Sequence, residues 1–362
     1  VFSFIIIVED GDNIEYFIAR DRIGVRPLYI GYDYNDNIVF SSELKGMKDI
    51  VKSAKQFNPG HYMKINGMEN IYESYYEVPV NYDGVYKCNI NDIDQSNILK
   101  LINKTLTNCV NKRLISDRPV CALLSGGLDS SLVCSIASKI LKEKGLDLYT
   151  FSIGIEGSPD NIYAQKVADF IGSKHTVITI TSEDAINALE SVIWATETYD
   201  ITTIRASTGQ YLVSKYIAEN TDFKVVLSGD GSDEVTSGYL ENYNAPNDVE
   251  MHEHTIERIK NIHYYDVQRA DRATSIHGLE LRVPFLDVSF VNMYLNIDKK
   301  LRLPRKDGLC EKFLLRKAFE DNYLPNDILW RRKEAFSDGI SSTKKSWYEI
   351  IQDNCEGKYT DE

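Results

Sequence analysis

The 362-residue chain lacks a basic surface and a long apolar segment. It carries 54 acidic against 41 basic side chains, a net charge of −13 at pH 7, whereas nucleic-acid and membrane-surface binding need clustered positive charge. Its longest apolar run, Phe2 to Val8, is too short to cross a bilayer and lacks the flanks of a signal peptide. We therefore expect no nucleic-acid partner and no membrane association, and we expect this run to form a strand.

Two further absences bear on the cellular compartment of the chain and on the class of reaction that it can catalyse. The six cysteines form neither a C-x-x-C pair nor a short disulfide framework, which favours a reducing, cytoplasmic location. No G-x-x-x-x-G-K-[ST] or G-x-G-x-x-G segment occurs, so kinase and dehydrogenase functions lose their main support. With 362 residues and 43% hydrophobic content, the chain is long enough for two domains.

The chain does carry a different glycine-rich loop between a predicted strand and a predicted helix. The strand is the apolar run Val120–Leu124, and the helix covers residues 132–141. Between them, Gly126 and Gly127 allow the backbone to approach an anion, and the helix N-terminus offers free N–H groups. Hydroxyl donors come from Ser125, Ser130 and Ser131.

Acidic residues in two loops favour a divalent cation. Asp129 lies in the first loop, and a carboxylate beside a phosphate is repulsive unless such a cation separates them. A second glycine loop, residues 228–234, follows the apolar run 223–227 and supplies Asp233. Acidic residues in exposed loops are usually only solvated. The presence of the first loop makes metal binding the favoured role for the acids of the second loop. The two loops together predict a Mg-ATP site with Asp129 and Asp233 as Mg²⁺ ligands.

Alternating strands and helices indicate a doubly wound parallel sheet, in which ligands bind beyond the carboxyl ends of the strands. The apolar patterns predict strands at 148–153 and 175–180 and helices at 97–114 and 183–196, the last capped by Thr181 and Asp184.

The first loop, Ser-Gly-Gly-Leu-Asp-Ser, resembles the pyrophosphate loop (PP-loop) of the ATP pyrophosphatase family. Further segments resemble, in order, the C-terminal synthetase domain of class B glutamine-hydrolysing asparagine synthetases, almost continuously over residues 118–339. This resemblance implies an α/β fold with a doubly wound parallel sheet of the ATP pyrophosphatase type. The segments that carry it are Phe151–Asp160, Glu197–Ser207, Gly238–Leu240, Leu281–Asp287 and Arg332–Gly339.

The opening residues resemble the second half of that family's N-terminal glutaminase domain. The resemblance rests on Ala19–Gly31 and Ser41–Lys45, among strand-like pieces that we expect to pack as one sheet. It implies a partial, β-rich α+β glutaminase-like domain of the N-terminal-nucleophile type. The family's nucleophile is an N-terminal cysteine, whereas residue 1 here is valine; we expect a fragment that does not hydrolyse glutamine. The expected domains are 1–77 (glutaminase-like), 78–96 (linker) and 97–362 (synthetase).

The resemblance implies a carbon–nitrogen ligase that forms AMP. Aspartate would attack ATP to give β-aspartyl-AMP and pyrophosphate, and ammonia, free or derived from glutamine, would then displace AMP to give asparagine. The implied cofactor is Mg²⁺ with ATP as substrate, and the resemblance allows a homodimer.

The resemblance also implies roles for individual residues. Lys333 would stabilise charge on the α-phosphoryl group, and Asp230 would accept a proton from the attacking ammonia, although many family members carry Glu there. Arg205 would hold the α-carboxylate of aspartate, and Tyr239 would orient the adenylate. The implied ATP-binding residues are Leu124, Ser125, Gly126, Gly127, Asp129, Ser130, Ile153, Ser228 and Gly229, with Leu124 and Ile153 against adenine.

Plainer interpretations stay open for several of these residues. Lys333 could belong to a solvated basic run, Arg205 to a structural ion pair and Tyr239 to the core. The charged segment Arg269–Arg272 and Arg282 are expected to form internal ion pairs. Two other functions also stay open: a sister enzyme of the same fold that acts on another carboxylate, and a catalytically silent subunit.

Overall fold

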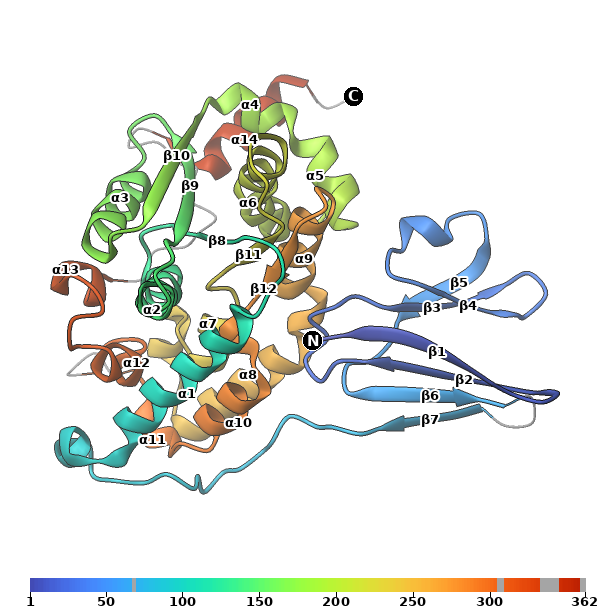
Figure 1. Ribbon diagram of the computed structural model, residues 1–362, viewed down its shortest axis with the longest axis horizontal. Helices are drawn as coiled ribbons and strands as arrows, with labels where there is room; N and C mark the ends of the chain where they lie inside the picture. The colour runs from blue at the N-terminus through green and yellow to red at the C-terminus, as the bar shows by residue number, and fades with distance from the viewer. Residues whose placement is uncertain (67–69, 305–308, 333–344, 359–362) are drawn as a thin grey trace.

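The computed structural model describes residues 1–66, 70–304, 309–332 and 345–358, and it has two differently built parts (Figure 1). The N-terminal part consists of antiparallel strands, and the larger part has a parallel sheet with helices on both faces. No helix within the described residues is long and apolar enough to cross a membrane.

The N-terminal strands form two antiparallel sheets rather than the single sheet expected. One has the order β1–β2–β6–β7 and the other β4–β3–β5. A small core of five residues lies between these strands, including Ile18 from the first sheet and Ile30 from the second. Because apolar residues of both sheets must share this core, the strand-like segments separate into two layers. The bounds are β1 (Ser3–Asp10), β2 (Asn13–Arg20), β3 (Tyr29–Asp33), β4 (Ile38–Ser41), β5 (Val51–Gln56), β6 (His61–Ile65) and β7 (Asn70–Ser74).

The larger part is built on a five-stranded parallel sheet with the order β10–β9–β8–β11–β12. The chain begins at the central strand, β8, adds β9 and β10 on one side, and then returns to add β11 and β12 on the other. The order therefore reverses between β8 and β11, so the loops that follow these two strands leave the same edge side by side. The strands are β8 (Val120–Leu123), β9 (Tyr149–Ile155), β10 (Lys174–Ile180), β11 (Val225–Leu227) and β12 (Glu280–Arg282).

Helices cover both faces of this sheet, with α2 and α3 on one side and α6 and α9 on the other (Figure 1). The α-helices are α1 (Asn97–Arg113), α2 (Leu128–Glu143), α3 (Pro159–Ile171), α4 (Ser182–Asn187), α5 (Leu189–Thr196), α6 (Ile201–Asn220), α7 (Ser232–Thr236), α8 (Asp248–Asn261), α9 (Asp266–Ser275), α10 (Val288–Leu295), α11 (Lys299–Arg302), α12 (Phe313–Ala318), α13 (Asn326–Leu329) and α14 (Trp347–Lys358). Short 3₁₀ turns are η1 (Lys45–Met47), η2 (Ile90–Gln95), η3 (Leu240–Asn244), η4 (Ile262–Tyr264) and η5 (Pro284–Leu286).

Helix α1 confirms the prediction for residues 97–114. The Ser96 hydroxyl accepts a hydrogen bond from the Ile98 amide and caps the helix. The residues repeated every four positions, from Ile98 to Val110, are all buried because α1 packs against α2, α10 and α12.

The prediction of a single helix over residues 183–196 is wrong, because the chain forms two helices, α4 and α5, with a break at Ala188. Its predicted cap is confirmed: Thr181 and Asp184 form a capping box at the start of α4. The break has a packing cause. Helix α4 buries Ala185 in a cluster with Trp347 of α14, whereas α5 buries Val192 in a separate cluster with residues of α6.

Helix α9 is held by side chains of the N-terminal part. Arg26 forms an ion pair with Asp271, and Arg272 pairs with Glu43 at 3.0 Å. The side chain of Arg272 is 2% exposed and that of Glu43 is 32% exposed, so solvent screens this contact less than it would screen a fully exposed pair. These pairs fix the position of the helix that faces the second glycine loop.

The contribution of buried α1 side chains to the free energy of unfolding can be measured. We expect Ile102→Ala to lower the free energy of unfolding by about 2–5 kcal/mol, because it leaves a cavity in the main core. Ile115→Ala is the control, since Ile115 is 76% exposed, and it should change the free energy of unfolding by less than about 0.5 kcal/mol. Urea titration measures both; equal effects would contradict the assigned core.

Candidate active site

The two glycine loops are in backbone contact where β8 and β11 end. A Cβ atom added to Gly229 would lie 2.6 Å from the Ser130 backbone nitrogen and 2.8 Å from the Asp129 carbonyl carbon. Any side chain at residue 229 would therefore push the loops apart. The first loop is also held internally, with the hydroxyl oxygens of Ser125 and Ser130 2.9 Å apart.

A cavity of about 440 Å³ opens between these loops and extends towards α6, α9 and α12. Nine of the predicted site residues line it: Ser125, Gly127, Asp129, Ser130, Ser228, Gly229, Asp230, Asp233 and Tyr239. Helix α2 starts directly after Gly127 at the cavity wall, which gives the site the partial positive charge of a helix N-terminus.

Four other predicted site residues that the structure describes do not line the cavity. Leu124 and Ile153 are buried, at 1% and 9% exposure, and are not among the lining residues. Gly126 has φ of +74° and packs on α3, where a Cβ would come 2.6 Å from the Tyr163 Cβ. Arg205 of α6 has its guanidinium carbon 5.2 Å from the ring centre of Tyr348 on α14 and also does not line the cavity. Lys333 lies outside the described residues.

The two predicted metal ligands converge on one cationic atom. The Nζ of Lys312 lies 2.6 Å from Asp129 Oδ2 and 2.7 Å from Asp233 Oδ1. The other Asp129 oxygen accepts a hydrogen bond from the Ser232 hydroxyl at 2.7 Å. Mg²⁺ in nucleotide sites is commonly bound by one or two carboxylates plus phosphate oxygens. The carboxylates of Asp129 and Asp233 are therefore suitable Mg²⁺ ligands. The described residues hold no cluster of three or more His, Cys, Asp or Glu side chains placed to bind a metal.

Asp230 is held on both carboxylate oxygens. Its Oδ1 lies 3.1 Å from Arg269 Nη2, and its Oδ2 accepts a hydrogen bond of 2.5 Å from the Ser228 hydroxyl. Arg269 also pairs with Asp266 at 3.0 Å. Burial acts to lower the pKa of Arg269, but the carboxylates of Asp230 and Asp266 outweigh it and raise that pKa.

A buried carboxyl group lies beside this pair. Glu234 is 4% exposed and accepts a short hydrogen bond from the Tyr239 hydroxyl. Burial, reinforced by Asp266 and Asp233, raises the pKa of Glu234 from 4.5 to about 8. Burial also raises the pKa of Tyr239. Glu234 is therefore mainly protonated at neutral pH, which limits the negative charge around Asp230.

Sequence reasoning gave no site role to five cationic residues that line the cavity: Arg269, Lys312, Arg316, Arg331 and Arg332. Arg269 was expected only in internal ion pairs, which the structure confirms, but its guanidinium also lines the cavity. Arg331, which with Arg332 and Lys333 forms the basic run of the sequence, pairs with Asp160 at 3.2 Å and stacks on Tyr163. The sequence around Lys312 does not indicate a role in the site, because the partners of Lys312 lie in distant segments of the chain.

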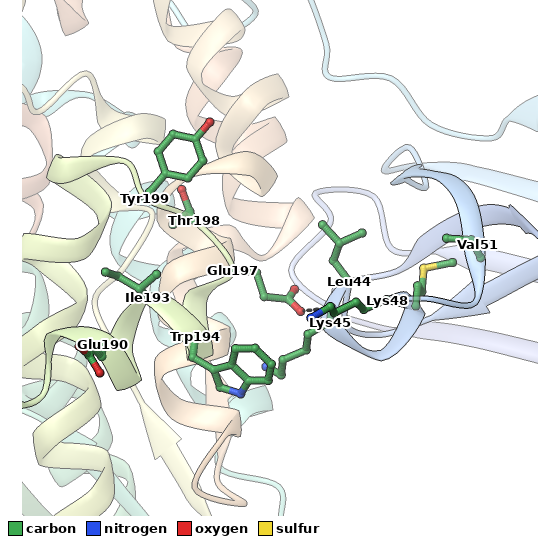
Figure 2. A pocket seen from close by; sticks show the side chains of 11 residues that line it. Leu44, Lys45, Lys48, Val51, Glu190, Ile193, Trp194, Glu197, Thr198 and Tyr199 are labelled. Atoms are coloured by element: carbon green, nitrogen blue, oxygen red, sulfur yellow. Dashed lines mark hydrogen bonds between the residues drawn. The ribbon is translucent and has the colours of Figure 1, made fainter.

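A second cavity lies between the two parts of the chain and does not involve the glycine loops (Figure 2). It measures about 530 Å³, and its walls are η1 with its neighbours on one side and α5 with the following turn on the other. The Lys45 amide donates a hydrogen bond of 2.7 Å to Glu197 across the boundary (Figure 2). Its walls combine apolar side chains, of which Trp194 is prominent, with charged ones that include Lys45 and Lys48. None of the predicted nucleotide-site residues lines it, so the first cavity remains the candidate nucleotide site.

A parallel sheet of this order, with two glycine loops and paired acids at its switch point, defines a nucleotide-binding α/β domain of the ATP pyrophosphatase type. Residues 101–254 and 241–360 match the Asparagine synthase family, and residues 1–77 match the Glutamine amidotransferase domain. The chain belongs to the asparagine synthase family.

Individual relatives match the sequence of this chain along its whole length. Over 382 aligned residues it is 45% identical to the glutamine-hydrolyzing asparagine synthetase of Mus musculus, a match that covers 100% of this chain and 67% of the relative. The Homo sapiens enzyme of the same name is 45% identical over 381 residues, with the same coverage. That of Gallus gallus is 45% identical over 372 residues, which is 98% of this chain and 66% of the relative.

The protonated Glu234 should shape the pH dependence of stability. Above pH 4.5 the unfolded chain loses this proton, whereas the folded chain keeps it up to about pH 8. The contribution of Glu234 to stability is therefore full below pH 4.5 and falls as pH rises to about 8. We expect Glu234→Gln to flatten the decline of Tm over this window.

Glu257→Gln, on the exposed side of α8, is the matched control and should keep the slope of the unmodified chain. Thermal unfolding followed by circular dichroism at several pH values measures the difference. Parallel Tm profiles for Glu234→Gln and the unmodified chain would contradict a buried, protonated Glu234.

Proposed function

We propose that this chain forms asparagine from aspartate and ammonia at the cost of ATP, through β-aspartyl-AMP, with release of pyrophosphate and AMP. The observation that carries the proposal is the backbone contact of the two glycine loops around one cavity, which gathers phosphate-binding groups and the carboxylates of Asp129, Asp230 and Asp233. Membership of the asparagine synthase family supports the identity of the acid.

We propose the domain division 1–77, 78–96 and 97–362. In support, the β-sheets of the N-terminal part end at Ser74 and helix α1 begins at Asn97. The first range also coincides with the match to the Glutamine amidotransferase domain. A cytoplasmic location is supported by six free cysteines, three of which are buried thiols.

For the first step, the chain must hold ATP and neutralise the leaving pyrophosphate. Asp129 and Asp233 would hold Mg²⁺, which would neutralise phosphate charge while the α-phosphorus is attacked. The loop hydroxyls of Ser125 and Ser130 and the N-terminus of α2 would donate to the phosphates. Arg331, at the cavity wall, adds positive charge. Lys333 would take the charge that develops on the α-phosphoryl oxygens.

For the second step, a base must take a proton from the attacking ammonia. Asp230 would do this, since Arg269 and Ser228 hold its carboxylate at the cavity. Glu234 would stay protonated and would not compete for that proton. Tyr239, at the same wall, would orient the adenylate. Arg205 stays our candidate for the α-carboxylate of aspartate, with its guanidinium on the α14 side of α6.

The direct test uses the purified chain with Mg-ATP and ammonium chloride. We expect pyrophosphate release and asparagine with aspartate, and neither product with glutamate or without an acid. Release with another acid alone would make the chain a sister enzyme. If the folded chain releases no pyrophosphate with any acid, the catalytic proposal is wrong.

Asp230→Asn separates the two steps. We expect asparagine formation to fall by about 10²-fold or more, because the general base is lost, while a first turnover of pyrophosphate persists. Asp230→Glu restores a carboxylate and should recover most of the rate. Rapid quench with labelled ATP measures both products. Full asparagine formation by Asp230→Asn would exclude this residue as the base.

A further inference from the structure

The strongest feature outside the predicted site is the buried ammonium group of Lys312. Its side chain is 1% exposed and contacts both Asp129 and Asp233. These are the two carboxylates that we assign to Mg²⁺. The cation that the chain itself supplies therefore occupies the point where the two ligands meet.

The surrounding backbone is built to admit this side chain. Lys312 stands before α12 with φ of +57°, a conformation that non-glycine residues adopt rarely. Its Cε passes over Gly238, where a Cβ would lie 2.0 Å from that atom and 2.3 Å from Asp233 Oδ1. A glycine at residue 238 thus leaves room for the lysine to reach the carboxylates.

The charges of the site explain why the contact of Lys312 with Asp129 and Asp233 would depend on whether Mg²⁺ is bound. Two carboxylates with one ammonium group leave a net charge of −1, which keeps the acids close together without a metal. Mg²⁺ on the same oxygens would stand next to the ammonium group, and like charges a few ångströms apart repel strongly in a partly buried site. The two cations therefore compete for the same oxygens.

We propose that Lys312 is an exchangeable counter-ion. Before ATP binds, it holds Asp129 and Asp233 together and opposes the binding of free Mg²⁺. When Mg-ATP arrives, the carboxylates pass to the metal and the Lys312 ammonium turns to the phosphate oxygens. Its four-carbon stem and three rotatable donors suit such a change of partner. This inference rests on the proposed Mg-ATP function.

The test compares Lys312→Met with the unmodified chain, using Mn²⁺ as the metal probe. Without nucleotide, we expect Lys312→Met to bind Mn²⁺ about tenfold or more tightly than the unmodified chain, because a competing cation is removed. The same variant should bind Mg-ATP about tenfold more weakly, because a phosphate contact is lost. Electron paramagnetic resonance of free Mn²⁺ and calorimetry with Mg-ATP give the two affinities.

Two further variants make the result interpretable. Lys317→Met on the same helix, α12, removes a partly exposed cation that pairs with Glu320, and it should change neither affinity. Lys312→Gln keeps a hydrogen-bond donor without the charge and should follow Lys312→Met if the methionine variant does not fold. In the unmodified chain, Mg-ATP should raise Tm whereas Mg²⁺ alone should not.

Each contrary outcome has a defined meaning. Equal Mn²⁺ affinity in Lys312→Met and the unmodified chain, or a Tm rise with Mg²⁺ alone, would overturn the exchange. If the unmodified chain binds Mg-ATP but Lys312→Met binds it equally well, the transfer to phosphate is wrong. If the unmodified chain binds no Mg-ATP at all, the proposed function itself fails, which distinguishes the two.

Discussion

The contact between the two glycine loops is the constraint on which the rest of the site depends. It exists because the strand order reverses between β8 and β11, so residues about a hundred positions apart leave the sheet side by side. At Gly229 the loops approach so closely that a single methyl group would collide with the other backbone. Asp129 and Asp233 can share one cation only because the loops meet in this way.

Four acids of the site are kept close together in two ways, by pairing with a cation or by keeping a proton. Asp129 and Asp233 are balanced by Lys312, Asp230 is balanced by Arg269, and Glu234 keeps its proton. Buried ion pairs add little net stability when their desolvation is counted. We infer that these pairs are retained for the placement of charge near a nucleotide, in a chain whose overall charge of −13 would repel it.

The N-terminal part contributes to this placement. Arg26 and Glu43 hold neighbouring residues of α9, and the same helix presents Arg269 to Asp230. The position of the proposed base is thus coupled to residues outside the parallel sheet. The coupling runs through one rigid helix and two buried or partly buried ion pairs.

Features encoded by adjacent residues could be predicted, and features set by distant packing could not. Both loops, the strands before them and helix α1 follow from local apolar patterns and glycine positions. The break between α4 and α5 depends on two separate clusters, one of which includes Trp347, more than 150 positions away. Lys312 gives no local signal because only the fold brings it to Asp129. The same reason explains why the two N-terminal sheets looked like one.

Membership of the asparagine synthase family is the basis of the reaction that we propose. We propose that the paired loops bring the β-carboxylate of aspartate to the α-phosphorus of ATP, which it attacks. Aspartate labelled with ¹⁸O in that carboxylate tests it most directly, with AMP and pyrophosphate analysed by mass spectrometry. We expect one ¹⁸O atom in AMP and none in pyrophosphate. Formation of asparagine with unlabelled AMP would contradict it.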